Sequence, residues 1–175
     1  WKTLDGGWRY FDASGEQATG WRAVDGSWYF MADNGLMQTG WLETGGKKYY
    51  LNASGAMQAG WQNLSGSWYY FDGSGAMTTG WQAVGGKWYY MNESGVMQTG
   101  WLDLGGKKYY LDASGAMYAG TTFVMDGNTW QAAADGSCTV VLPEENVAEN
   151  GGSTAGQTPT TGSQSPAQPS GPAGV

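Results

Sequence analysis

Short strand-like stretches alternate with glycine-centred polar turns along residues 1–120, and the whole pattern repeats every 20 residues. In the second unit, for example, Asp25-Gly26 precedes the aromatic run Trp28-Tyr29-Phe30-Met31, and Asn34-Gly35 follows it. Aromatic residues favour strands, and Asp-Gly suits the type I′ turn of a hairpin, in which both central residues need positive φ. Glycines at this density leave no helical periodicity. The pattern predicts an all-β fold with one hairpin and one loop in each unit.

The repeat is regular enough to predict the architecture. Trp stands first in six successive units, at residues 1, 21, 41, 61, 81 and 101, without an insertion or deletion between them. A single hairpin of this length is only marginally stable in water, so each unit must bury its aromatic side chains against its neighbours. We therefore expect a solenoid of stacked β-hairpins with mostly nearest-neighbour contacts.

A period of three units lies within the 20-residue repeat. The eleventh position of the units reads Phe, Met, Leu, Phe, Met, Leu, and the eighth position reads Trp, Trp, Lys, Trp, Trp, Lys. Duplication of a 60-residue block contributed to this pattern. It also fits a superhelix in which three hairpins complete one turn, because units three apart then share the same environment.

Two further segments follow the six units. Residues 121–142 resemble a seventh, degenerate unit, with Gly127, Trp130 and Gly136 near hairpin positions, and we expect this unit to cap the open end of the array. Residues 143–175 hold all five prolines of the chain together with Ser, Thr, Gly and Gln, and no aromatic residue. This composition predicts a disordered linker or tail.

Composition excludes several classes of function. The chain has no histidine, which excludes Ser-His and Cys-His catalysis and His-ligated zinc, and Cys138 has no partner for an internal disulfide. The net charge is -7, and the 8 Lys and Arg residues form no basic stripe, so we expect no nucleic-acid partner. No apolar run is long enough for membrane insertion. We expect no cofactor, no metal and no catalytic residue in this sequence.

The aromatic side chains exceed what packing requires. The chain has 11 Trp, 11 Tyr and 4 Phe, with few Leu, Ile or Val in the six units. Aromatics at fixed repeat positions are commonly core, and we expect this of the tenth and eleventh positions. Aliphatic residues would serve that purpose without N–H and O–H groups that need partners. The excess therefore indicates binding, either of a cation over the ring faces or of stacked sugar rings.

Strand parity places these rings at the gaps between units. Side chains alternate across a strand, so the eighth and ninth residues of a unit point to opposite faces. Trp28 then faces one neighbouring gap and Tyr29 faces the other. The ninth-position Tyr recurs in every unit except the first, which has Arg9. We expect each gap to be walled by two Trp of one hairpin and a Tyr of the next.

The motifs resemble a known family. Thr39-Gly40-Trp41, Gly66-Ser67-Trp68-Tyr69-Tyr70-Phe71-Asp72 and Ser74-Gly75-Ala76-Met77 are similar to the choline-binding (cell-wall-binding) repeat of Gram-positive surface proteins, autolysins and phage lysins. The resemblance implies a left-handed β-solenoid with about three units per turn. It also implies choline sites between consecutive hairpins, each with two aromatics from one unit, one from the next and a Met beside them. Related repeats in glucosyltransferases and clostridial toxins bind glucans and receptors, so the ligand is left open at this point.

Carried over residue by residue, the resemblance implies at most four choline-binding gaps. The first uses Trp1, Trp8 and Tyr29, with Gln17 at its methionine position. The second uses Trp21, Trp28, Tyr49 and Met37, the fourth uses Trp61, Trp68, Tyr89 and Met77, and the fifth uses Trp81, Trp88, Tyr109 and Met97.

The third and sixth units depart from the family pattern, because Lys48 and Lys108 replace the second Trp. An ammonium group at that position removes a ring face and repels a quaternary cation. We expect the gaps after these units to stay empty or to bind something else, and each Lys to lay its stem over a neighbouring ring.

These observations favour a non-catalytic module that attaches a larger secreted or surface protein to choline or phosphocholine groups of wall teichoic and lipoteichoic acids. Two alternatives stay open. One is glucan or host-glycan binding, and the other is a structural spacer or adhesin stalk whose aromatics are all core. Asp12, Asp72 and Asp112 fit turn bonding better than acid–base catalysis. Any catalytic domain is expected to lie outside this sequence.

Overall fold

The computed structural model describes residues 1–142, which form one compact unit, Trp1–Leu142. The tail predicted for 143–175 lies outside the described residues, and its disorder stays a prediction. The regular structure of the described part is β throughout, and it contains no helix that could span a membrane. The strands are β1 (Lys2–Leu4), β2 (Gly7–Arg9), β3 (Gly20–Val24), β4 (Ser27–Met31), β5 (Gly40–Thr44), β6 (Lys47–Leu51), β7 (Gly60–Leu64), β8 (Ser67–Phe71), β9 (Gly80–Val84), β10 (Lys87–Met91), β11 (Gly100–Leu104), β12 (Lys107–Leu111), β13 (Thr121–Met125), β14 (Asn128–Ala132) and β15 (Cys138–Val141).

Each of the six 20-residue units folds as an antiparallel hairpin around its turn dipeptide. In the hairpin of β7 and β8, Trp61 pairs with Tyr70 and Asn63 pairs with Trp68. The turn residues Ser65-Gly66 have φ angles of 53° and 85°, as a type I′ turn requires at both central positions. Two successive positive φ angles occur at the turn of each hairpin from β1–β2 to β13–β14. The predicted all-β hairpin fold is confirmed.

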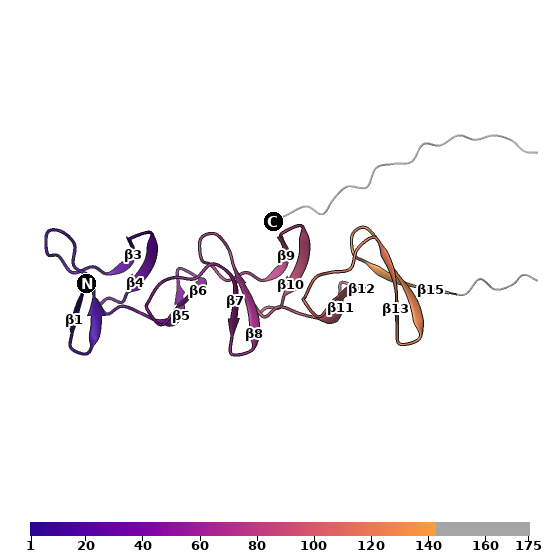
Figure 1. Ribbon diagram of the computed structural model, residues 1–175, viewed down its shortest axis with the longest axis horizontal. Helices are drawn as coiled ribbons and strands as arrows, with labels where there is room; N and C mark the ends of the chain where they lie inside the picture. Colours follow the sequence, from indigo (N-terminus) through magenta and orange to yellow (C-terminus); the bar gives the residue numbers. More distant parts are fainter. Residues whose placement is uncertain (143–175) are drawn as a thin grey trace, which may run out of the picture. The chain divides into compact units, whose positions relative to one another are not determined.

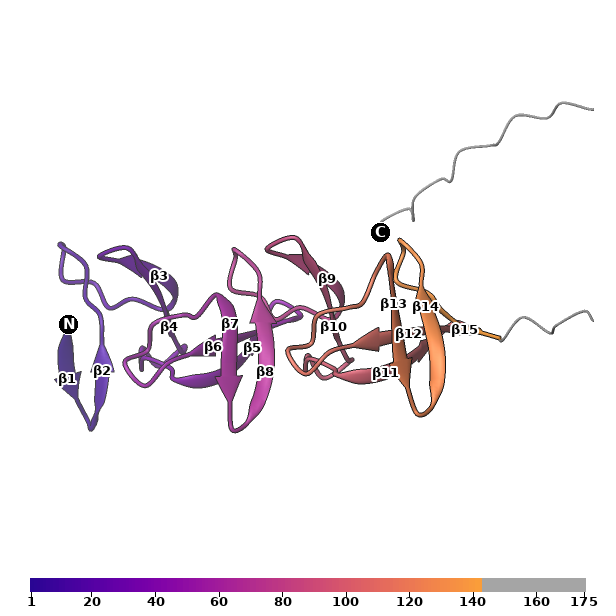
Figure 2. The same ribbon diagram turned by 45° about the vertical axis from the view of Figure 1, so that its right-hand side comes forward.

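The hairpins follow one another in a row instead of joining into one sheet. Each pair from β1–β2 to β9–β10 is a separate two-stranded sheet. Figures 1 and 2 show that hairpins three units apart, such as β1–β2, β7–β8 and β13–β14, point the same way. Three hairpins therefore complete one superhelical turn, which explains the three-unit period of the sequence.

The loops tie neighbouring hairpins together. From the second unit to the sixth, the N–H of the seventeenth residue donates to the C=O of the eighth residue of the preceding unit, as Met97 does to Trp68 at 2.8 Å. The seventeenth residue also bridges the eleventh residue of its own unit, as Met97 does with Met91. The seventeenth position of one unit therefore lies beside the eighth position of the unit before it.

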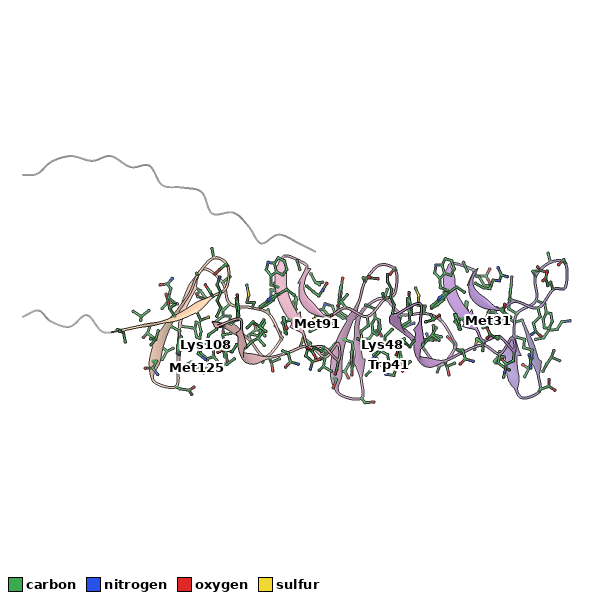
Figure 3. All side chains as sticks on the ribbon, turned by 180° about the vertical axis from the view of Figure 1, so that it is seen from behind. Met31, Trp41, Lys48, Met91, Lys108 and Met125 are labelled. Carbon is green, nitrogen blue, oxygen red and sulfur yellow. The ribbon has the colours of Figure 1, made fainter. Side chains whose placement is uncertain are left out.

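The largest buried side chains of the core come from the eleventh position of successive units. Met31, Leu51, Phe71, Met91 and Leu111 have 0% exposure, and Met31 and Met91 are labelled in Figure 3. Each such burial contributes about 1.5–3 kcal/mol to stability. The expected core role of the eleventh position is confirmed from the second unit on, whereas the tenth-position rings are only half-buried.

Residues 121–142 end the described part with a different arrangement. β13 and β14 form a seventh hairpin around Asp126-Gly127, and β15 pairs along β14 from Val141 to Cys138. β15 also meets β12 through Lys108 and Cys138, which gives a five-stranded order β11-β12-β15-β14-β13. The extra strand occupies one edge of the last hairpin, which suits a cap; the capping role itself stays a prediction.

Candidate functional site

The gaps between consecutive hairpins are the candidate sites, and each gap is numbered here by the unit that precedes it. The first residue of a unit pairs with the tenth and the third pairs with the eighth, as in the fourth unit. Because side chains alternate along a strand, the first, third, eighth and tenth residues share one face, and the ninth and eleventh share the other. The first and eighth residues of one unit therefore meet the ninth residue of the next unit.

A Trp and a Tyr form a corner in each of the first five gaps. In the fourth gap the ring centroids of Trp61 and Tyr89 lie 4.8 Å apart, with an interplanar angle of 70°. Edge-to-face aromatic pairs at this distance are favourable, so the corner is held before any ligand arrives. The equivalent pairs are Trp1–Tyr29 at 4.9 Å, Trp21–Tyr49 at 4.9 Å, Trp41–Tyr69 at 5.0 Å and Trp81–Tyr109 at 5.0 Å.

The eighth-position Trp stands beside this corner with its ring half exposed. In the fourth gap Trp61, Trp68, Tyr89 and Met97 line a cavity of about 340 Å³. Trp68 is 44% exposed, and Trp8, Trp28 and Trp88 are exposed to a similar degree. A fully buried ring can only pack, whereas a ring open to solvent can also receive a cation on its face.

The methionine of each gap comes from the following unit, which corrects the assignment carried over from the resemblance. Met77 was assigned to the fourth gap, but Met97 lines that gap, and Met77 lines the third gap beside Lys48. The reason is the bond between units, because Met97 donates its N–H to Trp68 and Met77 donates to Lys48. By the same bonds Met37 belongs to the first gap, Met57 to the second and Met117 to the fifth.

This shift by one unit completes the first gap. Gln17, which the sequence suggested for its methionine position, lies against Gly35 instead, where an added Cβ would clash with the Gln17 amide. Met37 donates its N–H to the C=O of Trp8 at 2.8 Å. The first gap thus has two Trp, a Tyr and a Met, as do the second, fourth and fifth gaps.

A third unit contributes a turn to the fourth gap, which the sequence did not suggest. Ala113 and Ser114 of the sixth unit complete the lining of that gap. Asp112 holds the turn, because its Oδ1 accepts bonds from the N–H of Ser114 at 2.8 Å, the hydroxyl of Ser114 at 2.5 Å and the N–H of Ala116 at 3.0 Å. The Ser114 hydroxyl is the main reason that the pKa of Asp112 lies below its ordinary value. The carboxylate therefore holds the turn that forms this wall of the gap.

The third gap has a different wall. Glu43 and Lys48 stand opposite each other on β5 and β6, and Figure 3 labels Trp41 and Lys48 together. The lining residues are Trp41, Leu42, Glu43, Lys48, Tyr69, Met77 and Ser94, around a cavity of about 430 Å³.

The sixth unit has a related charged pair. Asp103 lies opposite Lys108, and the carboxylate and ammonium groups approach to 3.2 Å as an exposed ion pair. Both pairs could have been predicted from the sequence, because the third and eighth residues of these two units carry opposite charges. The expected contact between each Lys stem and a neighbouring ring stays a prediction.

Other chemistry finds little support in the described part of the chain. No group of three His, Cys, Asp or Glu side chains is placed to hold a metal ion in residues 1–142. Cys138 is buried, and burial raises the pKa of its thiol. An unreactive small side chain at a strand pairing fits this environment.

Comparison with known proteins identifies the repeat. A family model described as choline-binding repeat matches residues 1–39, 18–59, 38–79 and 78–123. The chain belongs to the choline-binding repeat family. The four matches together cover all six regular units, so the hairpin array is an array of choline-binding repeats. No curated protein matches the sequence.

Solved structures of choline-binding proteins share this array. Choline binding protein F from Streptococcus pneumoniae, solved with a peptidoglycan analogue, is 39% identical with a TM-score of 0.74, over 79% of this chain and 51% of its own. A structure of CbpF with ipratropium is 44% identical with a TM-score of 0.70, over 76% and 42%. CbpJ from Streptococcus pneumoniae TIGR4 is 40% identical with a TM-score of 0.76, over 79% and 51%. The chain spans about half the length of CbpJ and, in the first comparison, of choline binding protein F.

Proposed function

We propose that this chain is a non-catalytic module whose first, second, fourth and fifth gaps hold choline or phosphocholine groups. It thereby attaches a larger secreted or surface protein to choline-bearing teichoic and lipoteichoic acids of a Gram-positive cell wall. One observation carries the proposal. The half-exposed face of Trp68 opens onto a cavity of about 340 Å³ whose other walls include the Trp61–Tyr89 corner and Met97.

The chemistry of this lining suits a quaternary ammonium group. Trimethylammonium spreads its positive charge over methyl groups, which need apolar contact and the negative faces of aromatic rings more than hydrogen bonds. The fourth gap offers three such rings and a polarisable thioether, and no Lys or Arg lines it. Ipratropium, the compound in the CbpF structure, is itself a quaternary ammonium compound, which supports the same reading.

Several weak sites explain why the unit is repeated. One exposed cation–π contact contributes about 0.5–1 kcal/mol, and about 2 kcal/mol when it is desolvated. A single gap therefore binds choline weakly. Several gaps that engage one polymer raise the apparent affinity by roughly 10²–10⁴ without any new kind of contact. The repetition serves attachment as well as folding.

Isothermal titration of the chain with choline tests the proposal. We expect heat of binding at about four sites. Trp68→Ala deletes one ring face, so it should weaken choline binding at the fourth gap by about tenfold or more, or abolish it. Trp68→Phe keeps a ring and should retain most of the binding. Val124→Ala is the matched control, because Val124 is an exposed residue of β13 outside the gaps.

The outcome separates the proposal from its alternatives. If calorimetry of the folded wild-type chain shows no heat of choline binding, the result would favour the structural spacer, in which the rings only pack. Displacement of the chain from its ligand by dextran or oligosaccharide but not by choline would support a glycan-binding module in its place.

A further inference from the structure

The third gap keeps the Trp–Tyr corner but loses the second Trp wall. The rings of Trp41 and Tyr69 lie 5.0 Å apart at 71°, and Trp41 is 48% exposed. Lys48 stands where the first, second, fourth and fifth gaps have an indole. The cavity here measures about 430 Å³, against about 340 Å³ in the fourth gap. Replacement of the ring by a Lys leaves a slot with one aromatic side and one polar side.

The polar side presents a hydrogen-bond donor next to an acceptor. Glu43 and Lys48 are directly opposite in the register of β5 and β6, which places their Cβ atoms about 5 Å apart. Lys48 forms no ion pair with any residue among 1–142, in contrast to Lys108 in the sixth unit. The Lys ammonium can only donate, and the Glu carboxylate can only accept. The Ser94 hydroxyl of the fifth unit adds a group that can do both.

This combination of charges opposes ligands that carry charge of a single sign. A quaternary ammonium group would meet the ammonium of Lys48, and a phosphate or other anion would meet the carboxylate of Glu43 and a chain of net charge -7. A neutral polyol is opposed by neither group. Each hydroxyl of such a ligand both donates and accepts, so neighbouring hydroxyls can satisfy Lys48 and Glu43 together.

We propose that the third gap binds a neutral pyranose sugar. The apolar C–H face of the ring lies on the exposed face of Trp41 inside the corner with Tyr69, and adjacent hydroxyls bind Lys48 and Glu43, with Ser94 at the rim. This site goes beyond the proposed function, because no choline-type gap takes part in it. With three hairpins per turn, the third gap also faces a different side of the array from the second and fourth gaps.

The test is an NMR titration of the whole chain with ¹⁵N-labelled tryptophan, first saturated with choline so that the choline-type gaps are occupied. N-acetylglucosamine and glucose are added separately, so that binding of an N-acetylated sugar is distinguished from binding of a plain hexose. Inorganic phosphate is added in a third titration to test for anion binding. The indole N–H signal of Trp41 is assigned from its loss in Trp41→Phe. We expect a sugar to shift that signal with a dissociation constant on the order of 1 mM, as suits a ligand of this size.

Variants connect the signal to the proposed contacts. Glu43→Gln and Lys48→Ala each remove one charged hydrogen-bonding group and should weaken sugar binding about tenfold. Val124→Ala should leave the Trp41 shift unchanged, because Val124 is exposed on β13 and lies outside the gaps. Both charged residues are exposed, so the variants are expected to fold, and unchanged indole signals elsewhere in the spectrum check this.

Three results overturn the proposal: no shift of Trp41 with either sugar, a shift with phosphate but not with sugars, or equal shifts of all exposed indoles. Choline binding is followed separately on the indoles of the fourth gap, without sugar. If choline does not bind in the fourth gap, the proposed function is wrong, but the result for sugar binding at Trp41 is unaffected.

Discussion

At the scale of the residue, the fold divides its large side chains between two tasks. Phe71 at the eleventh position has no exposed surface, whereas Trp68, three residues earlier, keeps almost half of its surface open. The two lie on opposite faces of β8, because their positions differ by an odd number of residues. The eleventh position therefore holds the hairpins together, and the eighth is available to a ligand. A substitution at the eighth position should change binding more than it changes stability.

The third gap provides a gain-of-function prediction at this scale. Lys48→Trp replaces the ammonium by an indole at a position that is already exposed, so the fold should tolerate it. The new ring would stand beside the Trp41–Tyr69 corner and Met77, which completes the choline-type set. We expect calorimetry to show one additional choline equivalent and the Trp41 indole to lose its response to sugar. Lys48→Leu is the control, because it removes the charge without adding a ring.

The packing of methionine against glycine gives a second prediction. Gly115 has a φ of 83°, and a Cβ built there would overlap the sulfur and methyl of Met97. Gly106 has a φ of 78° with nothing near the same point. Ala in this left-handed region costs about 1–2 kcal/mol, so Gly106→Ala should lose that amount in chemical denaturation.

Gly115→Ala should lose about 1–3 kcal/mol more, because it also overpacks the contact with Met97. It should weaken choline binding in the fourth gap as well, since Met97 lines that gap. Equal destabilisation by the two variants would mean that the Met–Gly contact contributes nothing.

At the scale of the element, each regular unit except the second is a hairpin followed by a turn built around the acceptor oxygen of an Asp or Asn at its twelfth position. Asp112 accepts from the N–H groups of Ser114 and Ala116, and Asn52 accepts equivalent bonds from Ser54 and Ala56. The carboxylate and the amide oxygen therefore build the same turn. They differ in that only the carboxylate titrates, which makes the turns with Asp sensitive to acid.

Acid should consequently destabilise the hairpin array. The pKa of Asp135 is lowered from 3.8 to about 2, chiefly because the Ser137 hydroxyl donates to the carboxylate, and the pKa values of Asp12, Asp72 and Asp112 are lowered for the same main reason. Since the unfolded chain binds these protons more readily, the stabilisation is complete above about pH 4 and is lost as the pH falls toward 2.

Thermal unfolding followed between pH 5 and 2 measures this loss. The variant with all four residues changed to Asn keeps the turn acceptor, as Asn52 and Asn92 do in this chain. Its melting temperature should fall less over the same range. A variant that loses stability in parallel with the wild type would show that other carboxylates are responsible.

At the scale of the whole molecule, stability and binding both accumulate along the array. Each described hairpin up to β9–β10 is its own two-stranded sheet, so neighbouring units are joined by one inter-unit backbone bond, the stacked core residue, the Trp–Tyr corner and the contact of a methionine with a glycine of the next unit. A ligand that fills a gap touches two or three units at once and should strengthen the array where it is otherwise joined by few contacts.

Choline should therefore raise the melting temperature. A ligand at ten times its dissociation constant stabilises the folded chain by about 1.4 kcal/mol per site, or roughly 5–6 kcal/mol for four independent gaps. Differential scanning calorimetry measures this shift. The matched control is 3,3-dimethyl-1-butanol, which has the shape of choline without its charge and should shift the melting temperature far less. An equal shift by the neutral compound would assign binding to apolar contact and not to cation–π attraction.

Much of the fold and part of the site follow from local patterns in the sequence. Turn dipeptides such as Asp25-Gly26 specify hairpins because few other residues accept two successive positive φ angles. The alternation of side chains along a strand then assigns Trp68 and Tyr69 to opposite gaps. The aromatic walls were therefore readable from the sequence together with the family resemblance, and the same repeat predicted the line of core residues.

The tertiary structure alone decided which loop and turn residues meet the hairpins of other units. The loop of each unit crosses to the hairpin before it, so Met97 joins Trp68, and the turn of the sixth unit reaches the fourth gap. No local pattern encodes these contacts, because they depend on the rotation and rise between stacked hairpins. A strict repeat hides that offset further, since shifting the partner by one unit leaves the residue types unchanged.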